Sequence, residues 1–374
     1  MTGTTRSSRT TTCHFDSLTT DTADRSRRAF LKRLAALAAL VPVERPIVAK
    51  PTAGRIDVHH HYQSPAYAQF LSKHPAAGPP VHWTLEADLD DMDGSGTATA
   101  ILSNFTPPTE GALDERRNLA RANNEFVTRL IAGHPGRFGL FATIPLPDID
   151  GCLRELEYAL DILKADGVAT YSNSGDRWLG DALFDPLWAE LNRRKALVYV
   201  HPTPADCCRN LVPDVPDTIV EYGADTTRTI ASLIFSGTTA RHPDVRFIFA
   251  HGGGTMPFVV ERFLGGTQAE IVPGVVTKGQ SPPFTPKQPP NGALYELRKM
   301  HYDTAQCSNP VAMSALRKVD PVTQILYGTD YWFRTAGETA RGLTTCGVFS
   351  VEELAAIDRG NAMRLLPRLS HPSV

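Results

Sequence analysis

The sequence lacks the features that mark several common classes of protein. Its 374 residues carry 38 Lys and Arg against 40 Asp and Glu, a formal net charge of -2. No excess of positive charge therefore favours binding to nucleic acid or to an anionic membrane. The six cysteines form no CxxC pair, which argues against a zinc cluster built from cysteines.

Long apolar runs are also missing, and the run at residues 34–41 is too short to span a bilayer. It follows Arg27 and Arg28, an arrangement that resembles a twin-arginine export signal. We expect residues 1–50 to form a disordered arm with a signal segment. The protein would then be exported, to the periplasm or the medium, without stable membrane insertion. The alternative is a cytoplasmic enzyme that keeps this segment as an arm.

Beyond this segment, short β-branched apolar runs alternate with amphipathic stretches such as Asn118–Ala132. This alternation predicts a parallel sheet covered by helices, in a single large α/β domain over residues 51–374. We expect a (β/α)8 barrel of the TIM type. An open doubly wound sheet is the alternative, but no Gly-rich loop follows the first strand. The predicted strands are Ile56–His59, Thr97–Asn104, Phe138–Ile144, Gly167–Thr170, Leu197–His201, Arg246–His251, Met300–Thr304 and Gln324–Thr329.

Two segments break the alternation. Residues 63–85 contain several Pro and His residues without a clear period, and residues 265–291 are rich in Pro and Gly. We expect both to be irregular and to lie at the C-terminal face of the barrel, where substrate loops belong.

Imidazole and carboxylate groups stand where four of the predicted strands end. The C-terminal ends of barrel strands meet at one rim, so these groups should converge there. Alternation along the first strand places His59 and His61 on one face and His60 on the other. Imidazole and carboxylate together suit Zn²⁺ or another borderline divalent ion. The converging residues are His59, His61, His201, His251 and Asp330.

These residues stand in motifs that together resemble the amidohydrolase superfamily. Within it they resemble the decarboxylases that act on 6-methylsalicylate, γ-resorcylate and 2-amino-3-carboxymuconate-6-semialdehyde. The resemblance covers about residues 55–340 and rests on four motifs: Asp57-Val58-His59-His60-His61, Val200-His201-Pro202, Ala250-His251-Gly252-Gly253-Gly254 and Gly328-Thr329-Asp330-Tyr331. It implies the barrel fold and a division of roles in the site. The implied metal ligands are His59, His61, His201 and Asp330, with His251 as the acid/base beside the metal.

The resemblance also bears on the number of metal ions. Two-metal members of the superfamily usually bridge their ions through a carboxylated lysine at the end of the fourth strand. The matching segment here, Gly167–Tyr171, has no lysine. One divalent ion is therefore implied, with Zn²⁺ ranked before Mn²⁺. Asp303 would orient a metal-bound histidine, and Asp57 would support His59 from the same face of the strand.

The resemblance suggests some substrate contacts. Arg262 lies eleven residues after His251, where the semialdehyde decarboxylase has a carboxylate-binding arginine supplied across a dimer interface. A homodimer is therefore implied. That enzyme has a second substrate arginine between its first two strands, but none lies between Arg55 and Arg116 here, which favours a mono-acid. Aromatic groups expected near the rim are Phe105, Tyr171, Phe284 and Trp332, and Trp332 and Phe284 are the candidate substrate contacts.

The implied activity is a metal-dependent, non-oxidative decarboxylase, a carbon–carbon lyase. It would convert a small aromatic hydroxy acid, such as 6-methylsalicylate or a hydroxybenzoate, to CO₂ and a phenol. With salicylate-like substrates Asp330 would deliver the proton that replaces CO₂. With muconate-like substrates water activated by the metal would act with His251, and the sequence leaves this choice open. A mononuclear metal-dependent hydrolase of a lactone or amide is the alternative, because the same site would serve a water nucleophile.

Overall fold

The computed structural model describes residues 54–78, 81–105, 110–265 and 288–370. They belong to one unit, residues 48–374. The predicted export segment lies outside the described residues, as do residues 266–287 of the predicted irregular segment at residues 265–291. Among the described helices, none combines the length and the apolar character needed to cross a membrane.

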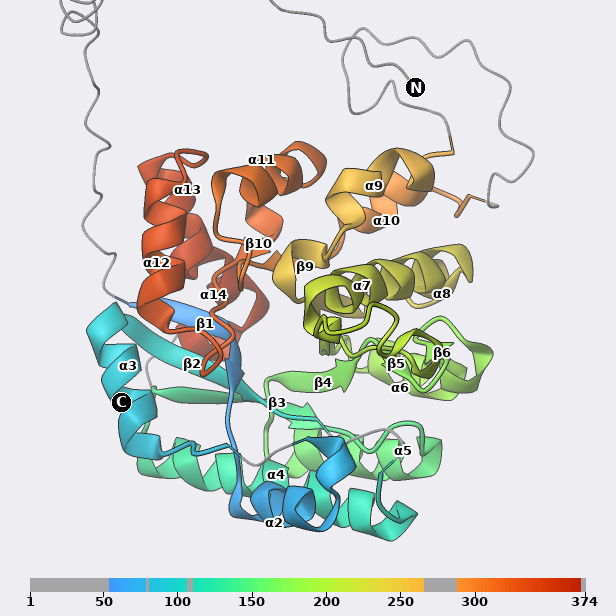
Figure 1. Ribbon diagram of the computed structural model, residues 1–374, viewed down its shortest axis with the longest axis vertical. Helices are drawn as coiled ribbons and strands as arrows, with labels where there is room; N and C mark the ends of the chain where they lie inside the picture. Colours follow the sequence, from blue (N-terminus) through green and yellow to red (C-terminus); the bar gives the residue numbers. More distant parts are fainter. Residues whose placement is uncertain (1–53, 79–80, 106–109, 266–287, 371–374) are drawn as a thin grey trace, which may run out of the picture. The chain divides into compact units, whose positions relative to one another are not determined.

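Eight parallel strands form one sheet in the order β1-β2-β3-β4-β7-β8-β9-β10, and helices surround them (Figure 1). The two edge strands meet, because the amide of Val58 donates to the carbonyl of Tyr327 at 3.0 Å. The amide of Asp330 likewise donates to the carbonyl of His59 at 2.9 Å. The predicted (β/α)8 barrel is confirmed. The strands are β1 (Arg55–His61), β2 (Thr97–Ser103), β3 (Phe138–Thr143), β4 (Gly167–Tyr171), β7 (Leu197–His201), β8 (Arg246–Phe249), β9 (His301–Asp303) and β10 (Ile325–Leu326).

Local sequence signals set the starts of several helices. Before α11, the side chain of Asn309 accepts hydrogen bonds from two backbone amides, and Pro310 fills the first helical position. Ser350 and Glu353 form a capping box at the start of α13. The main helices are α2 (Pro65–Lys73), α3 (Leu85–Ser95), α4 (Leu113–Gly133), α5 (Ile149–Glu157), α6 (Asp185–Arg193), α7 (Asp217–Phe235), α9 (Met256–Phe263), α10 (Ala293–Leu297), α11 (Pro310–Val319), α12 (Ala336–Thr345), α13 (Val351–Ala355) and α14 (Asn361–Leu365).

Helix α2 corrects one expectation, because it lies within residues 63–85, which were expected to be irregular. The side chain of Ser64 accepts a hydrogen bond from the amide of Tyr67 at 3.0 Å, and Pro65 occupies the first helical position. These two signals start a helix despite the weak periodicity, and Phe70 and Leu71 are the side chains it buries.

Apolar side chains fill both sides of the strands. One cluster lies inside the barrel and uses alternate strand residues, such as Phe141 of β3 and Tyr199 of β7, whose rings stack at 5.6 Å. A larger cluster lies between the strands and the helices and includes Trp188 of α6. Burying such a side chain contributes about 1.5–3 kcal/mol. The strands are therefore held on both faces, and their C-terminal ends carry side chains in fixed positions.

A bulge in β1 decides which of its side chains face the barrel interior. Asp57 pairs with Ala100 of β2, but His60, three residues later, pairs with Leu102, only two residues later. One extra residue is thus accommodated on β1. Bulges of this kind re-aim side chains beside active sites.

The bulge corrects the expectation that Asp57 shares a face with His59. Val58 belongs to the interior cluster, whereas the carboxylate of Asp57 bonds the ring of His60 at 2.9 Å. After the bulge, His59 and His61 both face the interior, as expected, and His60 faces away. Unbroken alternation gave the wrong side for Asp57, because it ignores the extra residue.

Candidate active site

Three imidazoles and one carboxylate meet at the C-terminal rim of the barrel. Nε2 of His59 lies 3.1 Å from Nε2 of His61. Oδ1 of Asp330 lies 3.1 Å from each of these nitrogens. His201 completes the group, whose ligand atoms all lie within 4.8 Å of one another. All four side chains are buried. The structure thus brings together the four residues that the sequence analysis proposed as ligands.

Hydrogen bonds fix the orientation of these rings. Nδ1 of His59 donates to Oδ2 of Asp303 at 2.8 Å, and the hydroxyl of Tyr199 donates to the same oxygen at 3.2 Å. Nδ1 of His201 donates to the carbonyl of Pro202 at 2.8 Å. Because Nδ1 carries the donated hydrogen, Nε2 can present a lone pair to the group, as metal-binding histidines do.

This donor set fits a divalent ion. Facing lone pairs on His59 and His61 repel each other unless a proton or a cation lies between them. Oδ1 of Asp330 is buried and accepts no hydrogen bond from any described residue. Three imidazole nitrogens and one carboxylate oxygen are a set that zinc and neighbouring divalent metals accept. The chain therefore holds a His/Asp site that fits a divalent metal ion.

The charges in the site depend on one another. Burial lowers the pKa of His59, but Asp303 and Asp330 outweigh it and raise that pKa to about 10. Burial, with the neighbouring His61, holds the pKa of His201 well below its ordinary value. Burial opposes ionisation of Asp330, yet His59 keeps the pKa of this carboxyl well below its usual range. Without an ion, the site therefore pairs a protonated His59 with an ionised Asp330.

Metal binding is expected to release about one proton per site at pH 7 and to weaken as the pH falls. The pKa of His59 is about 10, so its ring carries a proton that must leave before Nε2 can bind an ion. Each unit of falling pH should therefore weaken apparent affinity about tenfold. Calorimetric titration with Zn²⁺ in buffers of different ionisation enthalpy measures this release. An affinity that stays constant between pH 6 and pH 8 would contradict the expectation.

His251 stands beside the cluster in a constrained backbone conformation, with a φ of 55°. Its amide donates to Oδ1 of Asp303 at 2.9 Å, and its Nδ1 lies 3.1 Å from the carbonyl of Ala305. Its Nε2 lies 4.0 Å from Oδ2 of Asp330 and has no hydrogen-bond partner among the described residues. The tight turn needs glycine at Gly253, where a Cβ atom would meet the ring of Tyr302 at 2.8 Å. His251 therefore presents a free nitrogen to the site.

A cavity of about 430 Å³ opens beside these groups, a size typical of small-molecule sites. Gln306 lines it and donates a hydrogen bond to Oδ2 of Asp330, which leaves Oδ1 for an ion. The lining residues are His201, Thr218, Tyr222, Gly223, His251, Gln306, Asp330, Phe333 and Arg334.

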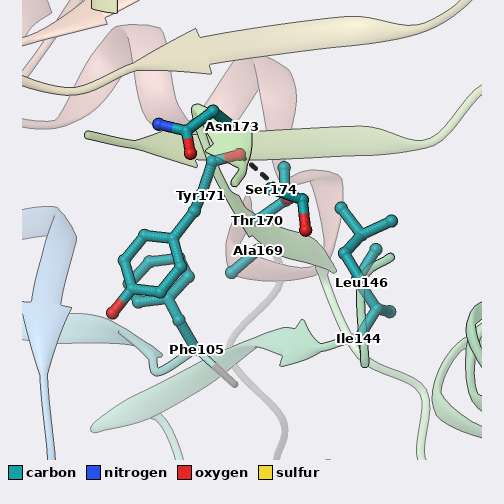
Figure 2. Close-up of a pocket in the computed structure, with 8 residues that line it drawn as sticks. All are labelled: Phe105, Ile144, Leu146, Ala169, Thr170, Tyr171, Asn173 and Ser174. Atoms are coloured by element: carbon teal, nitrogen blue, oxygen red, sulfur yellow. Dashed lines mark hydrogen bonds between the residues drawn. The ribbon is translucent and has the colours of Figure 1, made fainter. Parts of the chain in front are cut away.

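Aromatic side chains stand around the metal-ligand candidates. The rings of Phe105 and Tyr171 lie face to face (Figure 2). Their centres are 4.6 Å apart, and the centre of the Phe105 ring lies 5.3 Å from that of His201. They line a small hollow of about 10 Å³ behind the rim, which holds at most one water molecule. Trp332 lies 6.0 Å from His61.

None of the three proposed substrate contacts is among the described residues that line the cavity. Phe284 lies outside the described residues. Arg262 is exposed on α9 and is not among the described residues that line the cavity. The described residues that line the cavity therefore come from parts of the barrel that were not proposed as substrate contacts.

Several residues of the cavity are not at the ends of strands and were not expected from the sequence. Phe333 and Arg334 stand three and four residues after the ligand candidate Asp330. Gln306 lies on the loop after β9, and Tyr222 lies on α7. A search limited to the ends of strands passes over all four. The available signal was an aromatic residue and a cation within four positions of a rim carboxylate.

Asp57 and His60 form a buried polar network behind the ligands. Oδ1 of Asp57 accepts from the amides of His59 at 2.9 Å and Thr329 at 3.1 Å. The ring of His60 lies between Asp57, at 2.9 Å, and Asp88, at 2.8 Å, and stacks on Tyr331 at 4.6 Å. Burial lowers the pKa of His60, but Asp88 and Asp57 raise it to about 10. The network thus fastens the ligand strand β1 to the chain beside Asp330.

Asp57→Ala is expected to lower the free energy of unfolding by about 3–5 kcal/mol, because it leaves the buried, charged His60 without one partner. It also frees the amides of His59 and Thr329. Denaturant unfolding of the metal-free protein measures this. Asp93→Ala is the matched control, because Asp93 pairs with Arg137 at the surface and its loss should cost less than about 1 kcal/mol. Equal costs for the two variants would contradict this role for the network.

Comparison with known proteins extends these observations. Residues 56–368 match a family model described as amidohydrolase. Decarboxylase yanB of Aspergillus niger is 35% identical over 340 residues, which cover 85% of this chain and 89% of that protein. The 6-methylsalicylic acid decarboxylase of Penicillium expansum is 32% identical over 328 residues, which cover 84% of this chain and 97% of that protein.

A solved structure supports the fold. The 5-carboxyvanillate decarboxylase of Novosphingobium aromaticivorans, with bound manganese, matches with a TM-score of 0.74 and 19% sequence identity. The match covers 85% of this chain and 98% of that one. At this identity the likeness concerns the fold alone. From the family model and the two fungal relatives, the chain belongs to the amidohydrolase family, in its group of non-oxidative decarboxylases.

Proposed function

We propose that the protein is a metal-dependent decarboxylase of a small aromatic hydroxy acid, releasing CO₂ and a phenol. The observation that carries this proposal is the free Nε2 of His251, which lines the same cavity as Asp330 and lies 4.0 Å from its Oδ2. A decarboxylase needs a proton carrier beside the ion, and this pair would serve as one. The 6-methylsalicylic acid decarboxylase of Penicillium expansum, 32% identical, supports the substrate class.

The ion would be held by the cluster at the rim: His59, His61, His201 and Asp330. When bound, it supplies positive charge that offsets the charge on the carboxylate and phenol oxygens of the substrate. We propose Zn²⁺, with Mn²⁺ as the alternative that the manganese-bound relative supports. Elemental analysis of the purified protein distinguishes the two.

The chain's own residues then handle the proton. When the carbon–carbon bond breaks, the bond electrons remain on the ring carbon, which takes up a proton. We assign this proton to the pair of His251 Nε2 and Asp330 Oδ2, which lie 4.0 Å apart at the wall of the cavity. The bond from Nδ1 of His251 to Ala305 fixes the ring so that Nε2 faces the cavity. Gln306 orients the carboxylate of Asp330.

Aromatic side chains supply a site for the substrate ring. Phe333 lines the cavity, and its ring lies 6.0 Å from that of His61. Its side chain is 61% exposed, so it has free apolar surface on which a flat ring can stack. Tyr222, on the α7 side of the cavity, lies 5.9 Å from His201. An aromatic ring between these walls would hold its carboxylate near the ion.

The proposed reaction is tested with metal-loaded protein, 6-methylsalicylate and a panel of other hydroxybenzoates. CO₂ and the matching phenol should form in equal amounts. The alternative, hydrolysis at the same site, is tested with simple lactones and amides. Lactone turnover without CO₂ release from any acid in the panel would overturn the decarboxylase proposal in favour of a hydrolase.

We also propose a homodimer. Phe258 of α9 is 62% exposed, and Arg262, one turn later on the same helix, is exposed as well. Ile219, near the start of the neighbouring helix α7, is 71% exposed. Large exposed apolar side chains on adjacent helices are typical of subunit interfaces. Sedimentation of wild type and Phe258→Glu tests this, since only the variant should be a monomer. A monomeric wild type would overturn it.

The twin-arginine motif supports a further proposal, export of the protein. Fractionation of cells that make the tagged full-length chain tests this. Wild type should be found outside the cytoplasm, and a variant with Arg27 and Arg28 changed to Lys should stay inside. Equal cytoplasmic retention of both would favour the cytoplasmic alternative.

A further inference from the structure

Arg334 is a cation in the active-site cavity for which the proposed reaction gives no role. It lines the cavity together with His251 and Asp330, and it also lines a neighbouring hollow of about 280 Å³. Its amide donates to the carbonyl of Asp330 at 3.1 Å, which ties its backbone to a ligand candidate. Within the described ranges, its guanidinium has no ion pair and no hydrogen bond.

Two other arginines of the described chain show how this group binds an acid. Arg117 binds Asp148, and Arg194 binds Asp161 through two hydrogen bonds of 2.7 and 2.9 Å. A guanidinium offers five donors in a planar fork that matches a carboxylate. The guanidinium of Arg334 has no acid partner among the described residues, and it lies on the wall of a ligand cavity. It is therefore suited to an anionic ligand.

The reacting carboxylate is a poor choice for that anion. In the proposed function it lies near the divalent ion, which already offsets its charge, and it leaves as neutral CO₂. A cation that binds a group unchanged in the reaction stabilises both states equally and only tightens binding. Arg334 therefore suits a second anionic group that remains in the product.

The space around Arg334 fits this interpretation. The hollow on its other side shares Gln306 with the cavity, and the polar side chains of Ser308 and Asn309 line it. Glu338 is the described acid that lines this hollow, so an anion bound to Arg334 is expected on the cavity side. A substituent on the ring edge away from the ion could reach the guanidinium there.

We infer that Arg334 selects aromatic acids with a second anionic substituent, a carboxylate or an acidic phenol, which the product keeps. This rests on the proposed function and deepens it. The expectation of a mono-acid came from the lack of an arginine between Arg55 and Arg116. The loop after β10 supplies the cation instead.

Calorimetric binding of product-like phenols to the metal-loaded protein tests this. The probes are phenol and 3-hydroxybenzoate, which differ by one carboxylate. Wild type should prefer 3-hydroxybenzoate, and Arg334→Gln should weaken its binding by about 10- to 100-fold with little change for phenol. Arg334→Lys should recover part of the loss, because it keeps the charge but not the fork.

Arg341→Gln is the matched control, because Arg341 is exposed on α12 and does not line the cavity. It should bind both probes as wild type does. Equal binding of 3-hydroxybenzoate by wild type and Arg334→Gln would overturn the inference. This readout does not need turnover, so it stands apart from the decarboxylase proposal, which fails if wild type releases no CO₂ from any aromatic acid.

Discussion

Asp330→Asn is expected to lose the divalent ion and to lower the rate of CO₂ release by at least about 1,000-fold. Oδ1 of Asp330 is the one carboxylate oxygen among three imidazole nitrogens, and it lies 3.1 Å from two of them. Asparagine keeps the shape of the side chain but removes the charge that balances the ion. Elemental analysis and CO₂ measurement on the same preparation give both quantities.

His59→Ala should have the same effect, because it removes a ligand nitrogen that β1 supplies. β1 is the strand that meets β10 where the barrel closes, and Asp330 follows β10. Asp93→Asn is the control, since Asp93 is an exposed carboxylate paired with Arg137. It should keep the ion and the full rate. An Asp330→Asn protein with one tightly bound ion per chain and an unchanged rate would contradict the assignment of Asp330 to the metal site.

His251→Asn is expected to keep the ion and to lower kcat by about 100- to 10,000-fold, the range for loss of a general acid or base. His251 is not one of the four clustered ligand candidates, and its Nε2 is unpartnered among the described residues. Asparagine can donate to the carbonyl of Ala305, as Nδ1 does, but it cannot carry a proton. The measurement is kcat for CO₂ release alongside metal content.

Measuring metal content and rate on the same His251→Asn protein distinguishes a proton carrier from a metal ligand. Loss of the ion along with the rate would make His251 a ligand or a support of one. Retention of both would remove it from the mechanism. Asp303→Asn is a useful companion, because Asp303 bonds both the amide of His251 and the ring of His59. It should weaken metal affinity about 10- to 100-fold, as loss of a partner to a ligating histidine usually does.

The barrel and the ligand cluster could be predicted from the sequence because their signals are local. Apolar runs mark the strands, and a polar residue at the end of such a run is placed at the rim by the topology alone. His201 follows Leu197–Val200 in this way. Because the strands are parallel and adjacent, their C-terminal ends must meet at one rim, and the side chains there come together.

The remaining features depend on contacts between distant segments. The bulge in β1 shows only in its pairing with β2, and it reversed the side expected for Asp57. Gln306 and Tyr222 reach the cavity from a loop and a helix whose positions follow from packing. Arg334 has no special spacing in the sequence. Its lack of a described acid partner becomes visible only when its neighbours are known.

Decarboxylation at a single divalent ion is the central expectation for this protein. Metal-stripped protein should be titrated with Zn²⁺, and separately with Mn²⁺, while CO₂ release from the best aromatic acid of the panel is followed. The rate should rise from near zero and level off at one ion per chain. CO₂ release that persists in the stripped protein, or that continues to rise to two ions per chain, would contradict the account.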